Sequence, residues 1–415
     1  MAKSKPNDKK SKKRSKSTLN RVSGTPSKAP QPTLSPEVLL AQATATLQQG
    51  DILGSAEIAK QALDTYDGDS IASLPALNLL GEIHVELGEI DAAREYFLRA
   101  VAIDCDGTVG EELGGGAEKF LWLAQLSEEG GDDSVGWFEK GAGALRIQIQ
   151  ALQERRKLDA EGGALRGGMI IQALQERRKL DAEGGALLEE KRRKLAVALC
   201  GVVEVYMTDL SWEVDAEQKC EALVTEATMV TPEFAEPWQT LANVRISQSR
   251  LEDAQAALKR SLDLWKDLPP EDSQVPDFPT RVSLARLLME ADMDGEAIEV
   301  LERLVGEDDS SVEVWYLGGW GLYIMGEKQK NGEVKAENED GESWKISWIS
   351  SRQWLNHSLR LFDQQDYEDQ RLGEHAKELL AALNAELGGD TTNVEEEEDG
   401  DDWEDEGSDQ EMGGA

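Results

Sequence analysis

Residues 74–105 show the pattern of hydrophobic and polar positions expected of two consecutive amphipathic helices. The stretch reads LPALNLLGEIHVELGEIDAAREYFLRAVAIDC, and large apolar residues such as Leu80 and Phe97 recur at helical spacing. Small residues such as Ala93 lie between them and let two helix backbones approach closely. Gly88 separates the two halves, since glycine readily adopts the left-handed conformation that ends a helix. The pattern predicts a helix, a tight turn and a second helix.

This spacing resembles the tetratricopeptide repeat, a helix-turn-helix unit of about 34 residues. One such pair of helices cannot bury its apolar faces alone, so neighbouring repeats stack into a superhelix with an extended concave groove. We therefore expect an all-α fold, a tetratricopeptide-repeat superhelix (α-solenoid), whose groove binds another chain. The resemblance is carried by Leu80, Gly81, Gly88, Ala93, Phe97 and Ala100.

Weaker versions of the same pattern divide residues 34–387 into about seven repeats. The first begins near Ser35 and Pro36, where proline suits the first turn of a helix. A charged loop near 328–342 interrupts the seventh repeat. The segment 367–387 is predicted to be the terminal capping helix that solenoids need for solubility.

One segment of the chain is repeated without change. The sequence IQALQERRKLDAEGGAL occupies residues 149–165 and again 171–187. A diverged structural repeat would not be identical, so we interpret the region 149–187 as a recent internal duplication or a mis-assigned exon boundary, inserted in the first helix of the fourth repeat. The glycine pairs 162–163 and 184–185 are expected to break the helix.

The two ends of the chain differ sharply from the body in composition. Residues 1–33 are rich in lysine and proline and poor in large apolar residues, which predicts a disordered basic arm. Its KKSKKRSK run at 9–16 is typical of a nuclear-import signal that binds an import receptor, or of a merely solvated arm. Residues 388–415 form a predicted disordered acidic tail, which either shields a basic ligand or keeps the chain soluble.

Charge is the second strong signal. Of 415 residues, 44 are Lys or Arg and 82 are Asp or Glu, for a net charge of −38. Such a field repels nucleic acid and anionic membranes and attracts basic partners, so we expect no direct nucleic-acid or membrane binding. No apolar run approaches the roughly 20 residues that cross a bilayer, and the lysine-rich start has no signal peptide.

Residues that carry chemistry do not form a recognisable constellation. The three cysteines have no CxxC spacing, which argues against disulfides and zinc and predicts small buried residues in a reducing compartment. The three histidines are far apart, and His84 occupies a packing position of its repeat. We therefore expect no catalytic residues, no cofactor and no metal, and the protein is predicted not to be an enzyme.

The predicted groove is the better place to look for function. In each repeat the second, fifth, ninth, twelfth and thirteenth positions of the first helix face inward. They are mostly acidic, which disfavours capture of a C-terminal carboxylate by lysine and arginine and favours a basic partner. Acidic residues on helices are also often only solvated. The candidate partner-binding residues are Glu82, Glu86, Glu118, Glu128, Glu129, Asn243, Glu290 and Glu313.

An aromatic group lies near the end of the repeats. Trp315, Tyr316, Trp320 and Tyr323 could stack on lysine or arginine side chains of a partner. Such residues more often belong to the core. Trp315, Tyr316 and Trp320 are included among the candidate partner-binding residues.

The order of these features resembles a known family. The repeats, the basic arm, the motif VEVWYLGGWGLY at 312–323 and the acidic tail are similar to the fungal assembly chaperones of ribosomal large-subunit protein four. The resemblance implies a chaperone of the cytoplasm and nucleus. Members of this family capture the newly made ribosomal protein by its basic extension, keep it soluble and deliver it to nuclear pre-ribosomes.

The residues alone leave two other classes open. An acidic histone chaperone would share the charge and the nuclear signal. A non-catalytic scaffold in RNA processing or protein degradation would share the repeats, but its binding would depend little on salt.

Overall fold

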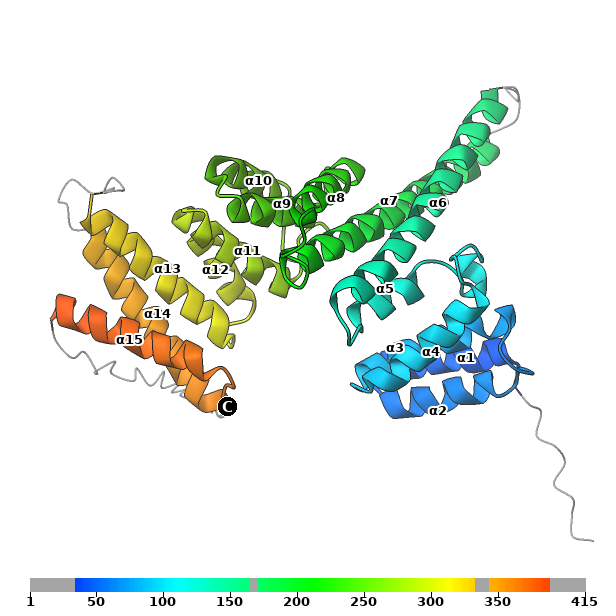
Figure 1. The fold of residues 1–415 in the computed structure, drawn as a ribbon, viewed down its shortest axis with the longest axis horizontal. Helices are drawn as coiled ribbons and strands as arrows, with labels where there is room; N and C mark the ends of the chain where they lie inside the picture. Colours follow the sequence, from blue (N-terminus) through cyan, green and yellow to red (C-terminus); the bar gives the residue numbers. More distant parts are fainter. Residues whose placement is uncertain (1–33, 165–170, 333–342, 389–415) are drawn as a thin grey trace, which may run out of the picture. The chain divides into compact units, whose positions relative to one another are not determined.

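The computed structural model describes residues 34–164, 171–332 and 343–388, and the side chains of 158–164 and 171–183 are not described. The predicted basic arm and nearly all of the acidic tail lie outside these residues. The described chain contains fifteen α-helices and no strand (Figure 1). It divides into two compact units, 1–96 and 97–415, and each is described by itself. The all-α expectation is confirmed.

Unit 1 holds the first repeat and most of the second. Its helices are α1 (Pro36–Gln48), α2 (Ile52–Leu63), α3 (Leu74–Glu86) and α4 (Ile90–Ile103), the last of which continues into unit 2. Ser35 precedes α1 with Pro36 in the first turn, as predicted. Its core cluster joins helices of both repeats and contains Ala43, Ala59, Leu80 and Ile83.

Unit 2 continues the pairs of helices. Its helices are α5 (Glu118–Gln125), α6 (Gly131–Ala164), α7 (Ile171–Met207), α8 (Ala216–Val230), α9 (Ala235–Ser247), α10 (Leu251–Asp263), α11 (Phe278–Glu290), α12 (Asp294–Glu307), α13 (Val312–Lys330), α14 (Ser343–Gln365) and α15 (Gln370–Leu387). Each pair from α5–α6 to α13–α14 is one repeat, and α15 packs on α13 and α14 as the final helix.

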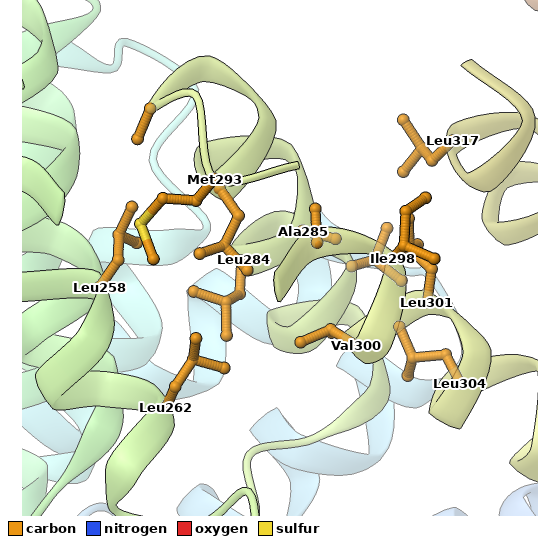
Figure 2. Packing of buried hydrophobic residues seen from close by; sticks show 14 of the residues in the cluster. Leu258, Leu262, Leu284, Ala285, Met293, Ile298, Val300, Leu301, Leu304 and Leu317 are labelled. Atoms are coloured by element: carbon orange, nitrogen blue, oxygen red, sulfur yellow. The ribbon is translucent and has the colours of Figure 1, made fainter. Parts of the chain in front are cut away.

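Small residues at the predicted positions let the helices of unit 2 pack. Ala242, Ala254, Ala285 and Ala297 are completely buried, and larger residues fill the spaces between them. The largest core cluster runs from α9 to α13, and Figure 2 shows part of it, including Leu258, Leu284, Leu301 and Leu317.

Most turns inside a repeat are three residues long and use a left-handed residue at the centre. Gly50 (φ +83°) and Gly88 (φ +72°) occupy this position in unit 1. Ser249 and Asp292 (φ +58° each) occupy it in the fifth and sixth repeats, although they are not glycines. The prediction that Gly88 ends the first helix of its repeat is confirmed, since α3 ends two residues before it.

The glycines within and just after the motif WYLGGW (315–320) have a packing explanation. A Cβ atom on Gly318 would lie 2.1 Å from the Trp354 ring, and one on Gly326 would lie 2.2 Å from the Trp348 ring. These glycines on α13 give the flat surface against which two tryptophans of α14 pack. The seventh repeat therefore depends on close approach of α13 and α14.

The duplicated segment departs from expectation. Copy 149–165 begins on α6, the second helix of the third repeat, and copy 171–187 begins α7, the first helix of the fourth. The two helices run along one another (Figure 1). The glycine pairs 162–163 and 184–185 do not break them, because a cost of about 1 kcal/mol per glycine is offset where a long helix packs on its neighbour.

A buried ion pair holds the connection between α4 and α5. The Nζ of Lys119 lies 2.7 Å from Oδ2 of Asp104, and both side chains are 1% exposed. Asp104 also accepts hydrogen bonds from the backbone N–H groups of Val109 and Gly116. Burial raises the pKa of Asp104, but the hydrogen bond from Lys119 and these backbone donors outweigh it and leave that pKa lowered.

Candidate protein-binding surface

The first helices of the repeats in unit 2 lie side by side. Helix α7 contacts α9, α9 contacts α11, and α11 contacts α13, while each second helix contacts the first helix of its own repeat and that of the next (Figure 1). We call the face formed by α5, α7, α9, α11 and α13 the inner face. Stacked repeats of this kind bind partners along that face.

A hollow of about 390 Å³ lies between α5 and α7 on the inner face. Apolar walls from Leu121, Trp122 and Val197 combine with charged side chains of both helices. Lys194 forms ion pairs with Glu118 and with Glu190. Burial lowers the pKa of Lys194, but the hydrogen bonds to these two carboxylates outweigh it and leave the pKa raised. The charges at this end of the face therefore neutralise one another.

Three carboxylates from three successive first helices lie farther along the same face. Glu204 lies near the end of α7, Glu236 in the first turn of α9, and Asp277 caps the start of α11 by accepting a hydrogen bond from the backbone of Thr280. We call Glu204, Glu236 and Asp277 the central carboxylates. Neither Glu204 nor Glu236 forms an ion pair with a residue described by the structure.

The surroundings of Glu236 and Glu204 favour the protonated forms of these two side chains. Burial raises the pKa of Glu236 to about 7, with a further contribution from the charges of Asp277 and Glu204 and an opposing one from Arg193. Burial also raises the pKa of Glu204. The negative charge of Glu236, which Arg193 partly opposes, is stabilised further when another cationic group approaches.

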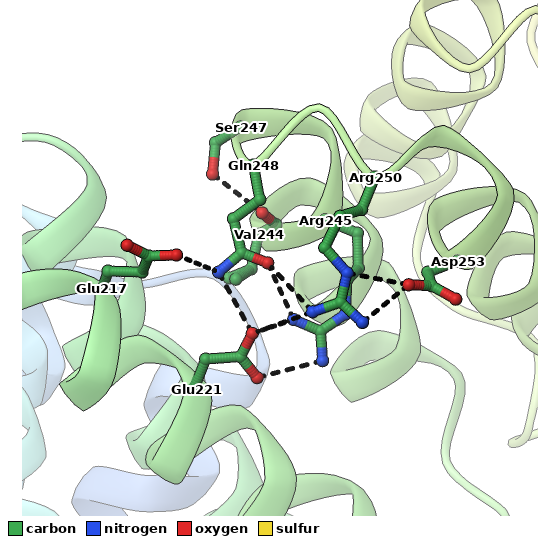
Figure 3. Close-up of polar contacts among 8 residues, drawn as sticks. All are labelled: Glu217, Glu221, Val244, Arg245, Ser247, Gln248, Arg250 and Asp253. Carbon is green, nitrogen blue, oxygen red and sulfur yellow. Dashed lines mark hydrogen bonds and ion pairs between the residues drawn. The ribbon is translucent and has the colours of Figure 1, made fainter.

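One other group of carboxylates in unit 2 is bound by cationic and amide side chains. On α8, Glu221 accepts hydrogen bonds from Arg245 and Arg250, and Gln248 bridges Glu221 and Glu217 (Figure 3). The hydrogen bond from Arg245 holds the pKa of Glu221 below its ordinary value. This network joins the fourth repeat to the fifth.

The predicted site residues of unit 1 lie on one helix. Glu82 is half-buried on α3, and Glu86 is exposed at its end. His84 stacks on Tyr96 at 5.2 Å, and its Nδ1 lies 2.7 Å from Glu89. The structural role expected of His84 agrees with these contacts.

The predicted site residues of unit 2 lie in surroundings that differ from one residue to the next. Glu118 and Glu313 are paired with Lys194 and Arg286. Glu290 is exposed at the end of α11, and Asn243 is half-buried on α9, on the helical stripe that carries Glu236. Whether any of them contacts a partner stays a prediction.

Two predicted residues are not on a helix. Helix α5 ends at Gln125, and Glu128 and Glu129 lie exposed in the turn before α6. Their placement on the inner face of a first helix is wrong, because α5 has only 8 residues.

The aromatic group packs within the end of unit 2. Trp315 stacks on His357 at 4.1 Å and donates its indole N–H to the backbone of Asp309. The hydroxyl of Tyr316 lies 2.7 Å from Nδ1 of His375, and Trp320 meets the same ring edge-on. These half-buried side chains join α13 to α14 and α15, which agrees with the core alternative.

Sequence reasoning missed the central carboxylates. Glu236 occupies the second position of the fifth repeat, so the rule that selected Glu118 could have found it. Cys200 and Cys220 are buried as expected, whereas Cys105 is exposed. Among the described residues, no three His, Cys, Asp or Glu side chains are grouped to hold a metal ion. No helix in the described ranges is long and apolar enough to cross a membrane.

Paired helices with small residues at the crossings and a row of first helices define a tetratricopeptide-repeat protein. The family model for the tetratricopeptide repeat matches residues 40–107. The probable assembly chaperone of rpl4 from Emericella nidulans is 49% identical over 371 residues, 88% of this chain and 86% of that protein. The chain therefore belongs to the family of assembly chaperones of rpl4, as its sequence suggested.

Two further comparisons agree. The probable assembly chaperone of rpl4 from Schizosaccharomyces pombe is 31% identical over 339 residues, which cover 81% of this chain and 87% of that protein. A solved structure of the assembly chaperone of RpL4, residues 1–338, is 56% identical with a TM-score of 0.63. It covers 72% of this chain, and this chain covers 100% of it.

Proposed function

We propose that this protein is a dedicated, non-catalytic chaperone that holds the newly made ribosomal protein rpl4 and keeps it soluble until assembly. The names of its relatives and its family support the identity of the client. The central carboxylates are the observation that carries the mechanism. They give the inner face unneutralised negative charge where a chain can lie across α7, α9 and α11.

The physical basis is replacement of RNA phosphates by carboxylates. A segment of a ribosomal protein that lies against RNA is basic, and it stays extended until RNA surrounds it. Carboxylates hold its lysines and arginines reversibly, and competing RNA releases them. The basic arm would bind an import receptor and take the complex from cytoplasm to nucleus, where the client joins pre-ribosomes.

The test neutralises the central carboxylates in the full chain. Glu204→Gln, Glu236→Gln and Asp277→Asn keep the side-chain sizes, and asparagine can still cap α11. We expect the dissociation constant for rpl4, measured calorimetrically at physiological salt, to rise roughly 10- to 100-fold.

A matched control removes the same charge from second helices. Glu252→Gln, Glu299→Gln and Glu302→Gln lie exposed on α10 and α12, away from the inner face. Their combined effect should be under about twofold, because exposed charges beyond a Debye length are screened. Equal losses in both triple variants, or no loss in the first, would contradict the proposal. Histones serve as a second basic ligand, and equal affinity for them would favour the histone-chaperone alternative.

A further inference from the structure

The turn between α7 and α8 is longer than the turns of four other repeats and displays two apolar side chains. It runs over residues 208–215, whereas the corresponding turns of the first, second, fifth and sixth repeats have three residues. Trp212 is 74% exposed and Val214 is 106% exposed. Exposure of these large apolar groups is unfavourable in water, and a partner that covered them would remove the cost.

The turn is held in place from both sides. Leu210 is 4% exposed and packs in the core cluster of α6, α7 and α8. The carboxylate of Asp209 accepts a hydrogen bond from the backbone of Gly131 at the start of α6. Lys219 on α8 forms ion pairs with Glu213 and Asp215 at 3.0 and 3.2 Å. The backbone that carries Trp212 and Val214 is thus fixed, so little ordering entropy is lost on binding.

A hollow of about 300 Å³ adjoins the turn. It is bordered by Ser211 of the turn, by Met207 at the end of α7, by Glu217 of α8 and by Gln248, which directly follows α9. Within seven residues of Trp212 the chain carries one cation, Lys219, against four carboxylates, which are Asp209, Glu213, Asp215 and Glu217. The surface therefore combines apolar anchors with net negative charge.

We propose that this turn, Thr208–Asp215, with the adjoining hollow, is a second docking site for the same basic client. It would engage the client's folded part, outside the extended segment held on the inner face. This inference rests on the proposed function. Glu204 of the inner face lies one helical turn before α7 ends, so a client that leaves this face past α7 meets the turn directly.

The charge and the aromatic side chain of this site favour a basic client over other ligands. An arginine or lysine can lie over an indole surrounded by carboxylates, as Lys219 lies 4.5 Å from the Tyr206 ring and Lys140 lies 4.1 Å from the Trp137 ring in this molecule. A tryptophan beside a hollow is also typical of binding hot spots. A second copy of this acidic chain would be repelled.

The experiment compares three ligands: whole rpl4, its isolated basic segment, and rpl4 lacking that segment. For the variant Trp212→Ala with Val214→Ser, we expect about tenfold weaker binding of whole rpl4, loss of binding of the segment-deleted form, and unchanged binding of the segment. Trp212→Phe should restore most of the affinity. The control Met229→Ala with Ile346→Ser removes two exposed apolar side chains elsewhere and should change nothing.

The outcomes separate the two proposals. Unchanged binding of whole rpl4 by the turn variant, or an equal loss for the isolated segment, would overturn the docking site and leave the inner face intact. A dimer that depends on Trp212, seen by light scattering, would overturn it in favour of self-association. Failure of the central-carboxylate variants to weaken the segment would instead count against the proposed function.

Discussion

Two groups of carboxylates in unit 2 differ in what surrounds them. Glu221 and its neighbours between α8 and α10 accept hydrogen bonds from two arginines, and the pKa of Glu221 is lowered. Among the central carboxylates of the inner face, burial and the charges of Asp277 and Glu204 raise the pKa of Glu236 to about 7 against the opposing charge of Arg193. The first group holds two repeats together, whereas the second stores unfavourable charge that a cationic client relieves.

This difference separates stability from binding. A paired carboxylate is stabilising only with its partner, so its loss should lower the free energy of unfolding without affecting the client. An unpaired one should behave in the opposite way, because its charge opposes folding and favours binding. Each substitution below is a test of that separation.

The buried pair Asp104–Lys119 is the extreme case of a paired carboxylate. Lys119→Met leaves Asp104 charged and buried, so the free energy of unfolding should fall by about 3–5 kcal/mol. Chemical denaturation measures the loss. Lys259→Met, an exposed lysine on α10, is the control and should change stability by less than about 0.5 kcal/mol. A small loss for Lys119→Met would mean that pairing does not stabilise this connection.

The network around Glu221 should show a smaller loss. Glu221→Ala leaves Arg245, whose side chain is 13% exposed, without its carboxylate, and we expect destabilisation by about 1–2 kcal/mol. Glu302→Ala, which removes an exposed carboxylate of α12 that lies away from both proposed binding sites, is the control. Both variants should bind rpl4 as the unmodified chain does. Weakened binding by Glu221→Ala, with the fold intact, would break the separation.

Glu236→Gln should change stability in the opposite direction. The pKa of Glu236 is higher in the folded chain than its ordinary value of 4.5, so the folded state binds more protons and stability falls as pH rises from 4.5 to 7. Glutamine cannot ionise, so the variant does not lose this stability as the pH rises. We expect the variant to gain about 1–2 kcal/mol at pH 8, after allowance for screening, and almost nothing at pH 5. A destabilised variant at pH 8 would show that the charge of Glu236 is satisfied in the free protein.

The sequence was sufficient for the repeats because local spacing determines how paired helices pack. Small residues such as Ala93 and Ala285 mark the crossings, and Gly88 marks a turn. Prediction from the sequence failed where a local helix propensity competes with the packing of one helix on another. The glycine pairs 162–163 and 184–185 carry a helix-breaking signal, but the packing of α6 on α7 overrides it.

For the candidate site, the sequence predicted the acidic nature of the inner face but not which carboxylates are paired. An acidic inner face follows from the repeat positions, but pairing does not, since Glu118 and Lys194 come together only when α5 lies beside α7. The central carboxylates are each one repeat apart in sequence. The effect of Asp277 and Glu204 on the pKa of Glu236 arises from the stacking of α7, α9 and α11, which no local pattern contains.

The pH dependence of client binding tests the central claim most directly. The basic segment of rpl4 should bind the unmodified chain three- to tenfold more weakly at pH 6 than at pH 8, because Glu236 must lose a proton before it can hold a cation. The variant Glu236→Gln should bind the segment more weakly than the unmodified chain at pH 8, and it should lose the part of the pH dependence that comes from Glu236. The histidines are the same in both proteins, so they contribute equally to the pH dependence of both. The same pH dependence in both proteins, or none in either, would contradict the account.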